Sequence, residues 1–250
     1  MRRNFTGKLF KRTKYLLKKK LHAVLNDPDL YEFNYSREVK DVLQRAFTFA
    51  SSNLVSGDYY EFGIYNGRSF LFALREAAKR PQRNIHCYGF DSFKGLSELH
   101  PVHDGNKDDI TGRQKWVKGD YACSKDDLVA KLCENKISNS SYTLIEGFYE
   151  DSLTKSLQEK MGKTAIVHID CDLYEPTKKV LWFIKPLLQD GTILIFDDYY
   201  CFKGNKNKGE ARAFSEFLEQ HQDIEATLWY RHHIAGAAFI VTTNESTTYY

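Results

Sequence analysis

Apolar residues recur along the chain in two spacings, one typical of helices and one typical of short buried strands. In residues 37–53 an apolar residue falls at every third or fourth position from Val39 to Ala50, which predicts an amphipathic helix with Ser36 as its N-cap. Helical spacing also predicts helices at residues 69–79, 125–135, 177–188 and 210–221. Short apolar runs predict strands at residues 59–64, 85–90, 142–145, 165–169, 192–196, 226–230 and 237–242.

The order of these elements predicts the fold class. Strands and helices alternate five times and are followed by two strands with a turn between them. Such alternation is typical of an α/β protein with a mostly parallel sheet and helices on both faces. The last two strands have the pattern of a hairpin, so we expect one antiparallel strand at the C-terminal end. Residues 94–120 are polar and are expected to form a long surface loop.

Charge divides the chain into a basic N-terminal arm and a mildly acidic body. Nine of the 36 Lys and Arg residues lie in the first 20 positions, which contain no acid, so the other 27 face 33 Asp and Glu residues. We expect an arm at residues 1–34, ending after a break at 26–29 (NDPD), a folded domain at 35–243 and a frayed tail at 244–250. Three interpretations of the arm stay open. It could contact an anionic membrane surface or polymer, it could be solvated, or it could form a helix packed on a partner subunit.

The composition excludes several classes of protein. Hydrophobic residues make up 42% of the chain, which excludes global disorder. No apolar run reaches the ~18–20 residues of a membrane-spanning helix, and no secretory signal pattern opens the chain. The five cysteines are scattered, without a C-x-x-C pair, so neither a disulfide framework nor a structural zinc site is expected. We expect a cytoplasmic homodimer that binds no nucleic acid.

Ligands of an open parallel sheet bind beyond the carboxyl ends of its strands, so the residues that follow each strand are the first candidates. Residues 61–69 (EFGIYNGRS) follow the first strand, and Glu61 stands where a dinucleotide-binding motif has its first glycine. An acid there would repel a pyrophosphate but would suit an ammonium or sulfonium group. Asp91 ends the second strand, where a carboxylate can bind both hydroxyls of a ribose or cap the turn that follows.

A positively charged nucleoside without phosphate satisfies both features, and S-adenosylmethionine is such a ligand. Pairs of glycines such as Gly63 and Gly67 also occur in tight strand-to-helix turns that bind no ligand, so a purely structural role for this turn stays open. Glu146 and Gly147 follow the third strand, where an adenine would be reached, although a simple loop is the alternative. The residues expected to contact the cofactor are Glu61, Gly63, Tyr65, Asn66, Gly67, Ser69, Asp91, Ser92, Glu146, Gly147 and Asp170.

Four aspartates follow the fourth and fifth strands, namely Asp170, Asp172, Asp197 and Asp198. Carboxylates that meet at adjacent strand ends repel each other unless a cation screens them. An all-oxygen set suits Mg²⁺, Mn²⁺ or Ca²⁺ better than zinc, although helix caps or partners for Lys and Arg are the alternative. We interpret His168 as a core histidine, because it lies inside an apolar strand, and His232 and His233 lie in the last turn, where they could face the site.

Four stretches carry a family resemblance, namely residues 60–69 (YEFGIYNGRS), 88–96 (YGFDSFKGL), 168–177 (HIDCDLYEPT) and 196–199 (FDDY). They closely resemble the macrocin O-methyltransferase family of class I S-adenosylmethionine-dependent enzymes, over about residues 36–242. That family methylates hydroxyls of deoxysugars on macrolide and aminocoumarin antibiotics and needs Mg²⁺. The resemblance therefore implies a Rossmann-like, seven-stranded methyltransferase fold in residues 35–243 and a sugar or glycan acceptor.

The resemblance also implies roles for the aspartates. Asp172, Asp197 and Asp198 are implied as metal ligands, and Asp170 as the general base or a further ligand. Catechol-type relatives carry a lysine base three residues after the first aspartate, and here that position is Leu173.

The implied mechanism is an in-line displacement at the sulfonium methyl. The metal would bind two neighbouring oxygens of a sugar diol, Asp170 would accept the proton, and the protein would align the reacting atoms. A nicotinamide-dependent oxidoreductase and a non-catalytic glycan-binding protein are the alternatives. The absent glycine of the dinucleotide motif argues against the first, and the four aspartates together with Glu61 and Asp91 argue against the second.

Overall fold

The computed structural model describes residues 28–104 and 117–244, so most of the basic arm and of the tail lie outside the described residues. The strands are β1 (Asp58–Phe62), β2 (Cys87–Asp91), β3 (Tyr142–Glu146), β4 (Thr164–Ile169), β5 (Ile193–Phe196), β6 (Ile224–His232) and β7 (Gly236–Thr243). The α-helices are α2 (Pro28–Ser52), α3 (Arg68–Ala78), α4 (Lys125–Glu134), α5 (Tyr149–Ser152), α6 (Lys155–Gln158), α7 (Tyr174–Ile184) and α8 (Gly209–Gln220). None of these helices combines the length and apolarity needed to cross a membrane.

The seven strands form one sheet in the order β3-β2-β1-β4-β5-β7-β6. All neighbouring pairs are parallel except the two that involve β7, which runs antiparallel to both β5 and β6. The predicted mostly parallel sheet with an antiparallel C-terminal strand is therefore confirmed. The strand order reverses direction between β1 and β4, which is the switch point where open α/β sheets bind ligands.

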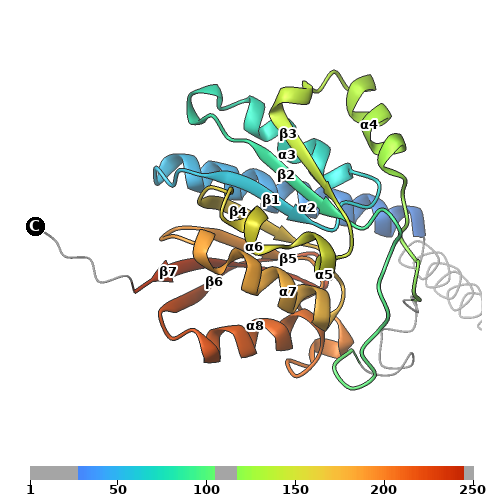
Figure 1. Cartoon of the computed structure of the whole chain (residues 1–250), viewed down its shortest axis with the longest axis vertical. Helices are drawn as coiled ribbons and strands as arrows, with labels where there is room; N and C mark the ends of the chain where they lie inside the picture. Colours follow the sequence, from blue (N-terminus) through green and yellow to red (C-terminus); the bar gives the residue numbers. More distant parts are fainter. Residues whose placement is uncertain (1–27, 105–116, 245–250) are drawn as a thin grey trace, which may run out of the picture.

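Helices cover both faces of the sheet, as Figure 1 shows. One hydrophobic cluster packs α2, α3 and α4 against one face, and a second packs α7 and α8, with α5 and α6 beside them, against the other. All residues of β4 and β5 are buried, because both strands lie inside the sheet between these layers. The apolar runs that predicted these two strands thus mark the centre of the molecule.

Two helices begin earlier than the sequence pattern indicates. α2 begins at Pro28 instead of residue 37, so Ser36 lies inside the helix and is not its N-cap, and the expected domain boundary at residue 35 falls within α2. α7 begins at Tyr174 instead of residue 177. Proline is accepted in a first helical turn, where no intrahelical N–H is needed, so Pro28 at the start of α2 and Pro176 in the first turn of α7 do not break these helices. The four-residue helices α5 and α6 are too short for periodicity to predict.

A residue distant in sequence completes the start of α7. The preceding residue, Leu173, has no side chain that could cap the helix. Instead, Asp104 accepts hydrogen bonds from the backbone N–H of Tyr174 and of His100, both at 2.7 Å. The Asp104 carboxylate is buried, and burial raises its pKa despite these two bonds. This contact fixes the described first part of the loop between β2 and α4, up to Asp104, against the start of α7.

Replacement of Asp104 by alanine should lower the free energy of unfolding by about 1–3 kcal/mol, because the buried N–H of Tyr174 and the partly buried N–H of His100 lose their acceptor. Urea denaturation measures the loss. The matched control is Asp126→Ala, an exposed acid in the first turn of α4, which should cost less than about 0.5 kcal/mol. Equal losses in the two variants would contradict the capping role.

Candidate active site

A cavity of about 980 Å³ opens at the carboxyl edge of the sheet. Its wall consists of the turns after β1 to β5, one side of α2 and the turn between β6 and β7. The predicted residues that line it are Gly63, Tyr65, Asn66, Ser69, Asp91, Ser92, Gly147, Asp170, Asp172, Asp197 and Asp198. Three predicted residues, Glu61, Gly67 and Glu146, are not part of the wall.

The turn between β1 and α3 requires both of its glycines for packing. Gly63 has a φ of 87°, and a Cβ there would lie 1.8 Å from the carbonyl oxygen of Asp170. Gly67 precedes α3 with a φ of 73°, and a Cβ there would lie 2.2 Å from Leu128. The turn therefore lies directly against the end of β4, with the cavity beside it.

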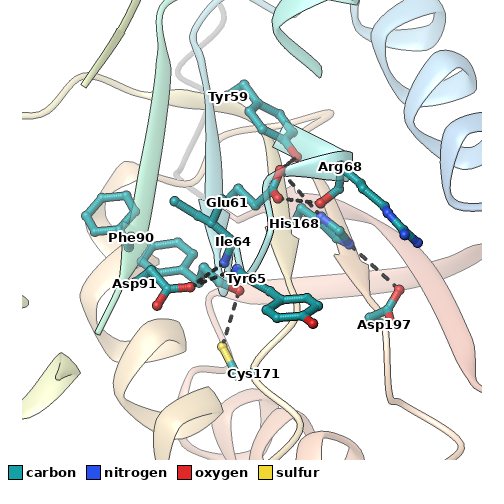
Figure 2. A network of polar contacts seen from close by, with 12 residues as sticks. Tyr59, Glu61, Ile64, Tyr65, Arg68, Phe90, Asp91, His168, Cys171 and Asp197 are labelled. Atoms are coloured by element: carbon teal, nitrogen blue, oxygen red, sulfur yellow. Dashed lines mark hydrogen bonds and ion pairs between the residues drawn. The ribbon is translucent and has the colours of Figure 1, made fainter. Parts of the chain in front are cut away.

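Asp91 holds this turn in place. One carboxylate oxygen accepts the N–H groups of Ile64 (2.7 Å) and Tyr65 (3.0 Å), and the other accepts the N–H of Phe93 (2.7 Å). Figure 2 shows the contacts with Ile64 and Tyr65. The side chain also lines the cavity, and a carboxylate has about four lone-pair sites, so acceptor capacity is left for a ligand hydroxyl.

Glu61 lies behind the cavity wall, in the interior between β1 and β4. Its carboxylate accepts hydrogen bonds from the hydroxyls of Tyr59 and Ser69, the latter at 2.6 Å, and the side chain is fully buried. His168 Nδ1 lies 3.7 Å from it (Figure 2). The expected direct contact of Glu61 with a sulfonium group is therefore not supported, because Tyr59, Ser69 and His168 enclose the carboxylate.

The other two residues outside the wall have partners of their own. Gly67 packs against Leu128 of α4. The Glu146 carboxylate lies 3.4 Å from the Lys125 ammonium group. Of the pair expected to reach an adenine, only Gly147 lines the cavity.

Three of the four aspartates form one group of oxygen donors. Asp170, Asp172 and Asp198 each offer a carboxylate oxygen, and these oxygens lie within 4.8 Å of one another. Burial and the neighbouring carboxylates raise the pKa of Asp170 and of Asp172 well above the usual range, and raise that of Asp198 to about 6. The predicted repulsion is thus present, and a hard divalent cation is the ligand that such a donor set fits.

The backbone directs Asp172 into this group. Asp172 has a φ of 60°, a left-handed conformation that aspartate tolerates better than most residues. It is the central residue of a three-residue turn in which the Leu173 N–H donates to the Cys171 carbonyl at 2.6 Å. The turn places a carboxylate oxygen of Asp172 within 4.8 Å of one of Asp170, which precedes it by two residues.

Asp197 has a different environment from the other three aspartates. One oxygen accepts the hydroxyl of Tyr35 at 2.5 Å, and the other lies 3.1 Å from His233 Nε2. The Ala235 N–H donates to His233 Nδ1 at 3.1 Å, so Nε2 carries the proton that His233 shares with Asp197. Burial raises the pKa of Asp197, but His233 and His168 outweigh it and lower the pKa well below the usual range. An oxygen of Asp197 also lies within 4.8 Å of one of Asp170.

The three histidines have different places. His168 is fully buried, as predicted, and its Nε2 lies 3.9 Å from Asp197. Burial lowers the pKa of His168, yet Asp197 and Glu61 raise it to about 10. His233 faces the cavity, whereas His232 is buried away from its wall, with a pKa lowered to about 3, mainly by burial.

Sequence reasoning missed two residues that act on the aspartates. Tyr35, the partner of Asp197, lies on α2 in a segment where no helix was predicted. Glu210, in the first turn of α8, accepts hydrogen bonds from the backbone beside the aspartates. No local sequence motif marks either residue as part of the site, because Tyr35 comes from α2 and Glu210 from α8 rather than from the strand ends that carry the aspartates.

Comparison with known proteins identifies the family. The sequence profile of the macrocin O-methyltransferase family (TylF) matches residues 18–231, and thus begins inside the predicted arm. The chain is 26% identical over 198 residues (79% of this chain, 74% of the relative) to the 8-demethyl-8-(2,3-dimethoxy-alpha-L-rhamnosyl)-tetracenomycin-C 4'-O-methyltransferase of Streptomyces olivaceus. It is 22% identical over 179 residues (72% and 67%) to the mycinamicin III 3''-O-methyltransferase of Micromonospora griseorubida.

A solved structure agrees with the fold. The O-methyltransferase NovP is similar with a TM-score of 0.67 and 20% identity, over 81% of this chain and 79% of that protein. The family profile covers most of the chain, including β1 to β5 and all of β6 except its last residue, whereas β7 lies beyond the match. The chain therefore belongs to the macrocin O-methyltransferase family and is an O-methyltransferase, not a nicotinamide-dependent oxidoreductase.

Proposed function

We infer that the chain transfers the methyl group of S-adenosylmethionine to a hydroxyl of a sugar, with the assistance of a divalent cation. The observation that carries this inference is the group of Asp170, Asp172 and Asp198 in the same cavity as the glycine turn held by Asp91. The names of the two relatives above specify O-methylation, one of them on a rhamnosyl-tetracenomycin, which supports a sugar-bearing acceptor.

The methyl donor would lie along the turns after β1, β2 and β3. There the backbone of the turn at Gly63 approaches closely, Asp91 offers acceptor capacity to the ribose, and Gly147 lines the side where an adenine is expected. Glu61 would act on this subsite indirectly, through its hydrogen bond with Ser69, which does line the cavity.

The cation would be held by Asp170, Asp172 and Asp198, with Asp197 adjacent to Asp170. Mg²⁺ or Mn²⁺ fits this all-oxygen set, and when bound it would lower the pKa of the hydroxyl to be methylated. Tyr35 and His233 hydrogen-bond the two oxygens of Asp197 and would fix its orientation, as outer partners of ligating carboxylates do.

Asp170 would accept the proton of the acceptor hydroxyl. Asp170 contacts both parts of the cavity. Its carbonyl oxygen packs on Gly63, in the turn between β1 and α3 where the methyl donor would lie (the donor turn), and its carboxylate belongs to the aspartate group. Burial and the neighbouring aspartates raise the pKa of Asp170, which makes its ionised form a stronger proton acceptor. The remaining contribution of the protein is alignment of oxygen, methyl carbon and sulfur.

S-adenosylhomocysteine should bind in the presence of a chelator, because the donor turn contains no part of the cation site. Asp91→Asn should weaken that binding roughly 10–100-fold, since a charged acceptor of hydrogen bonds is lost. Isothermal titration measures the affinity, with Asp126→Asn as the exposed control. An unchanged affinity in Asp91→Asn would remove the assignment of Asp91 to the ribose.

Turnover should require a divalent cation and should fall about 100-fold or more on chelation, because loss of the cation costs several kcal/mol of transition-state stabilisation. Asp198→Asn should show a similar loss while it still binds S-adenosylhomocysteine. A radiolabelled methyl-transfer assay on a panel of glycosylated acceptors measures turnover, with Asp223→Asn at the surface as the control. Full activity in protein shown to be metal-free by elemental analysis would contradict the proposal.

Asp172→Asn should stabilise the protein in the presence of a chelator, because the surroundings that raise the pKa of Asp172 disfavour its ionised form in the folded chain, and asparagine does not ionise. Asparagine also tolerates the left-handed backbone of this position, so charge is the main change. A gain on the order of 1 kcal/mol corresponds to about 2–4 °C in the melting temperature. A lower melting temperature than that of the wild-type chain would show that the carboxylate contributes to folding without a cation.

A further inference from the structure

A buried carboxylate lies behind the aspartate group, on the side away from the cavity wall. Glu210 belongs to the first turn of α8 and is 1% exposed. Its two oxygens accept hydrogen bonds from two backbone amides, one from the N–H of Cys171 at 3.3 Å and one from the N–H of Asp198 at 2.9 Å. Glu210 is not part of the cavity wall, so it acts on the site through these amides.

These two bonds join the two loops that carry the aspartates. The ladder between β4 and β5 ends at the pair Ile169 and Phe196, and the last bond beyond it runs from the Asp197 N–H to the Ile169 carbonyl at 3.0 Å. Past this point the loops are not linked by the sheet ladder. Glu210 bridges them, because Cys171 lies between the two aspartates that follow β4, and Asp198 follows β5.

A charged side chain at this position opposes folding, because Glu210 is buried next to the carboxylates of Asp197 and Asp198. A carboxylate nevertheless has a property that glutamine lacks, since both of its oxygens accept hydrogen bonds, whereas glutamine would direct an NH₂ group at one of the two amides. The bridge between the loops thus depends on a carboxylate of this length.

We propose that Glu210 is a positioning residue of the cation site, which sets the separation between the loop of Asp170 and Asp172 and the loop of Asp198. This inference rests on the cation-assisted function proposed above. Outer groups that orient metal ligands typically change metal affinity 10–100-fold when they are replaced. Glu210 would contribute in this way without contact with the cation, the donor or the acceptor.

The proposal is tested by the binding of Mn²⁺ alone to the full chain. Electron paramagnetic resonance measures the concentration of free Mn²⁺ and therefore the affinity. Glu210→Gln should weaken Mn²⁺ binding roughly 10–100-fold, while its affinity for S-adenosylhomocysteine, measured with a chelator present, should stay within about twofold of the wild-type value. Glu219→Gln, at an exposed position of the same helix, should change neither affinity.

A second variant separates position from charge. Glu210→Asp retains the charge but withdraws the carboxylate from the two amides, so it should also weaken Mn²⁺ binding, and it tests the proposal if Glu210→Gln does not fold. Wild-type Mn²⁺ affinity in either folded variant would overturn the positioning role. Equal losses of Mn²⁺ and S-adenosylhomocysteine binding would show a general structural role instead. A wild-type chain that binds no Mn²⁺ would refute the cation-assisted function, and this inference with it.

Discussion

Repulsion between carboxylates is the constraint on which the site depends. The parallel strands β4 and β5 end side by side, and the sequence places two aspartates within the three residues after each. Burial and mutual repulsion raise the pKa of Asp170, Asp172 and Asp198, which means that the folded state disfavours their ionised forms. Natural proteins accept such a cost where function requires the arrangement. A divalent cation would turn this repulsion into a binding site.

Internal hydrogen bonds keep these carboxylates in place from behind. Glu61 and Asp197 lie within 4 Å of the two ring nitrogens of the buried His168, and Glu210 accepts hydrogen bonds from both loops. Through Ser69, the same chain of contacts reaches the first turn of α3, next to the donor turn. The donor and cation halves of the cavity therefore share one buried polar network, which Figure 2 shows in part.

Local patterns predicted most of the fold and the residues at strand ends. β4 and β5 were predicted because apolar runs that end in acids are visible in the sequence itself, and Asp170, Asp172, Asp197 and Asp198 followed from them. The predicted start of α2 was wrong, because the helix begins at Pro28, where a break in the chain was expected. The interior position of Glu61 and the contributions of Tyr35 and Glu210 depend on side chains from other elements, which spacing along one strand does not reveal.

The most direct test of the central claim is the location of a cation in the crystal. Crystals of the full chain soaked in Mn²⁺ and measured at a wavelength where manganese scatters anomalously would reveal its position. The account predicts a single strong anomalous peak in the cavity, bounded by the carboxylates of Asp170, Asp172 and Asp198. A cavity without a peak, with these aspartates bound instead to lysine or arginine side chains or capping helices, would contradict it.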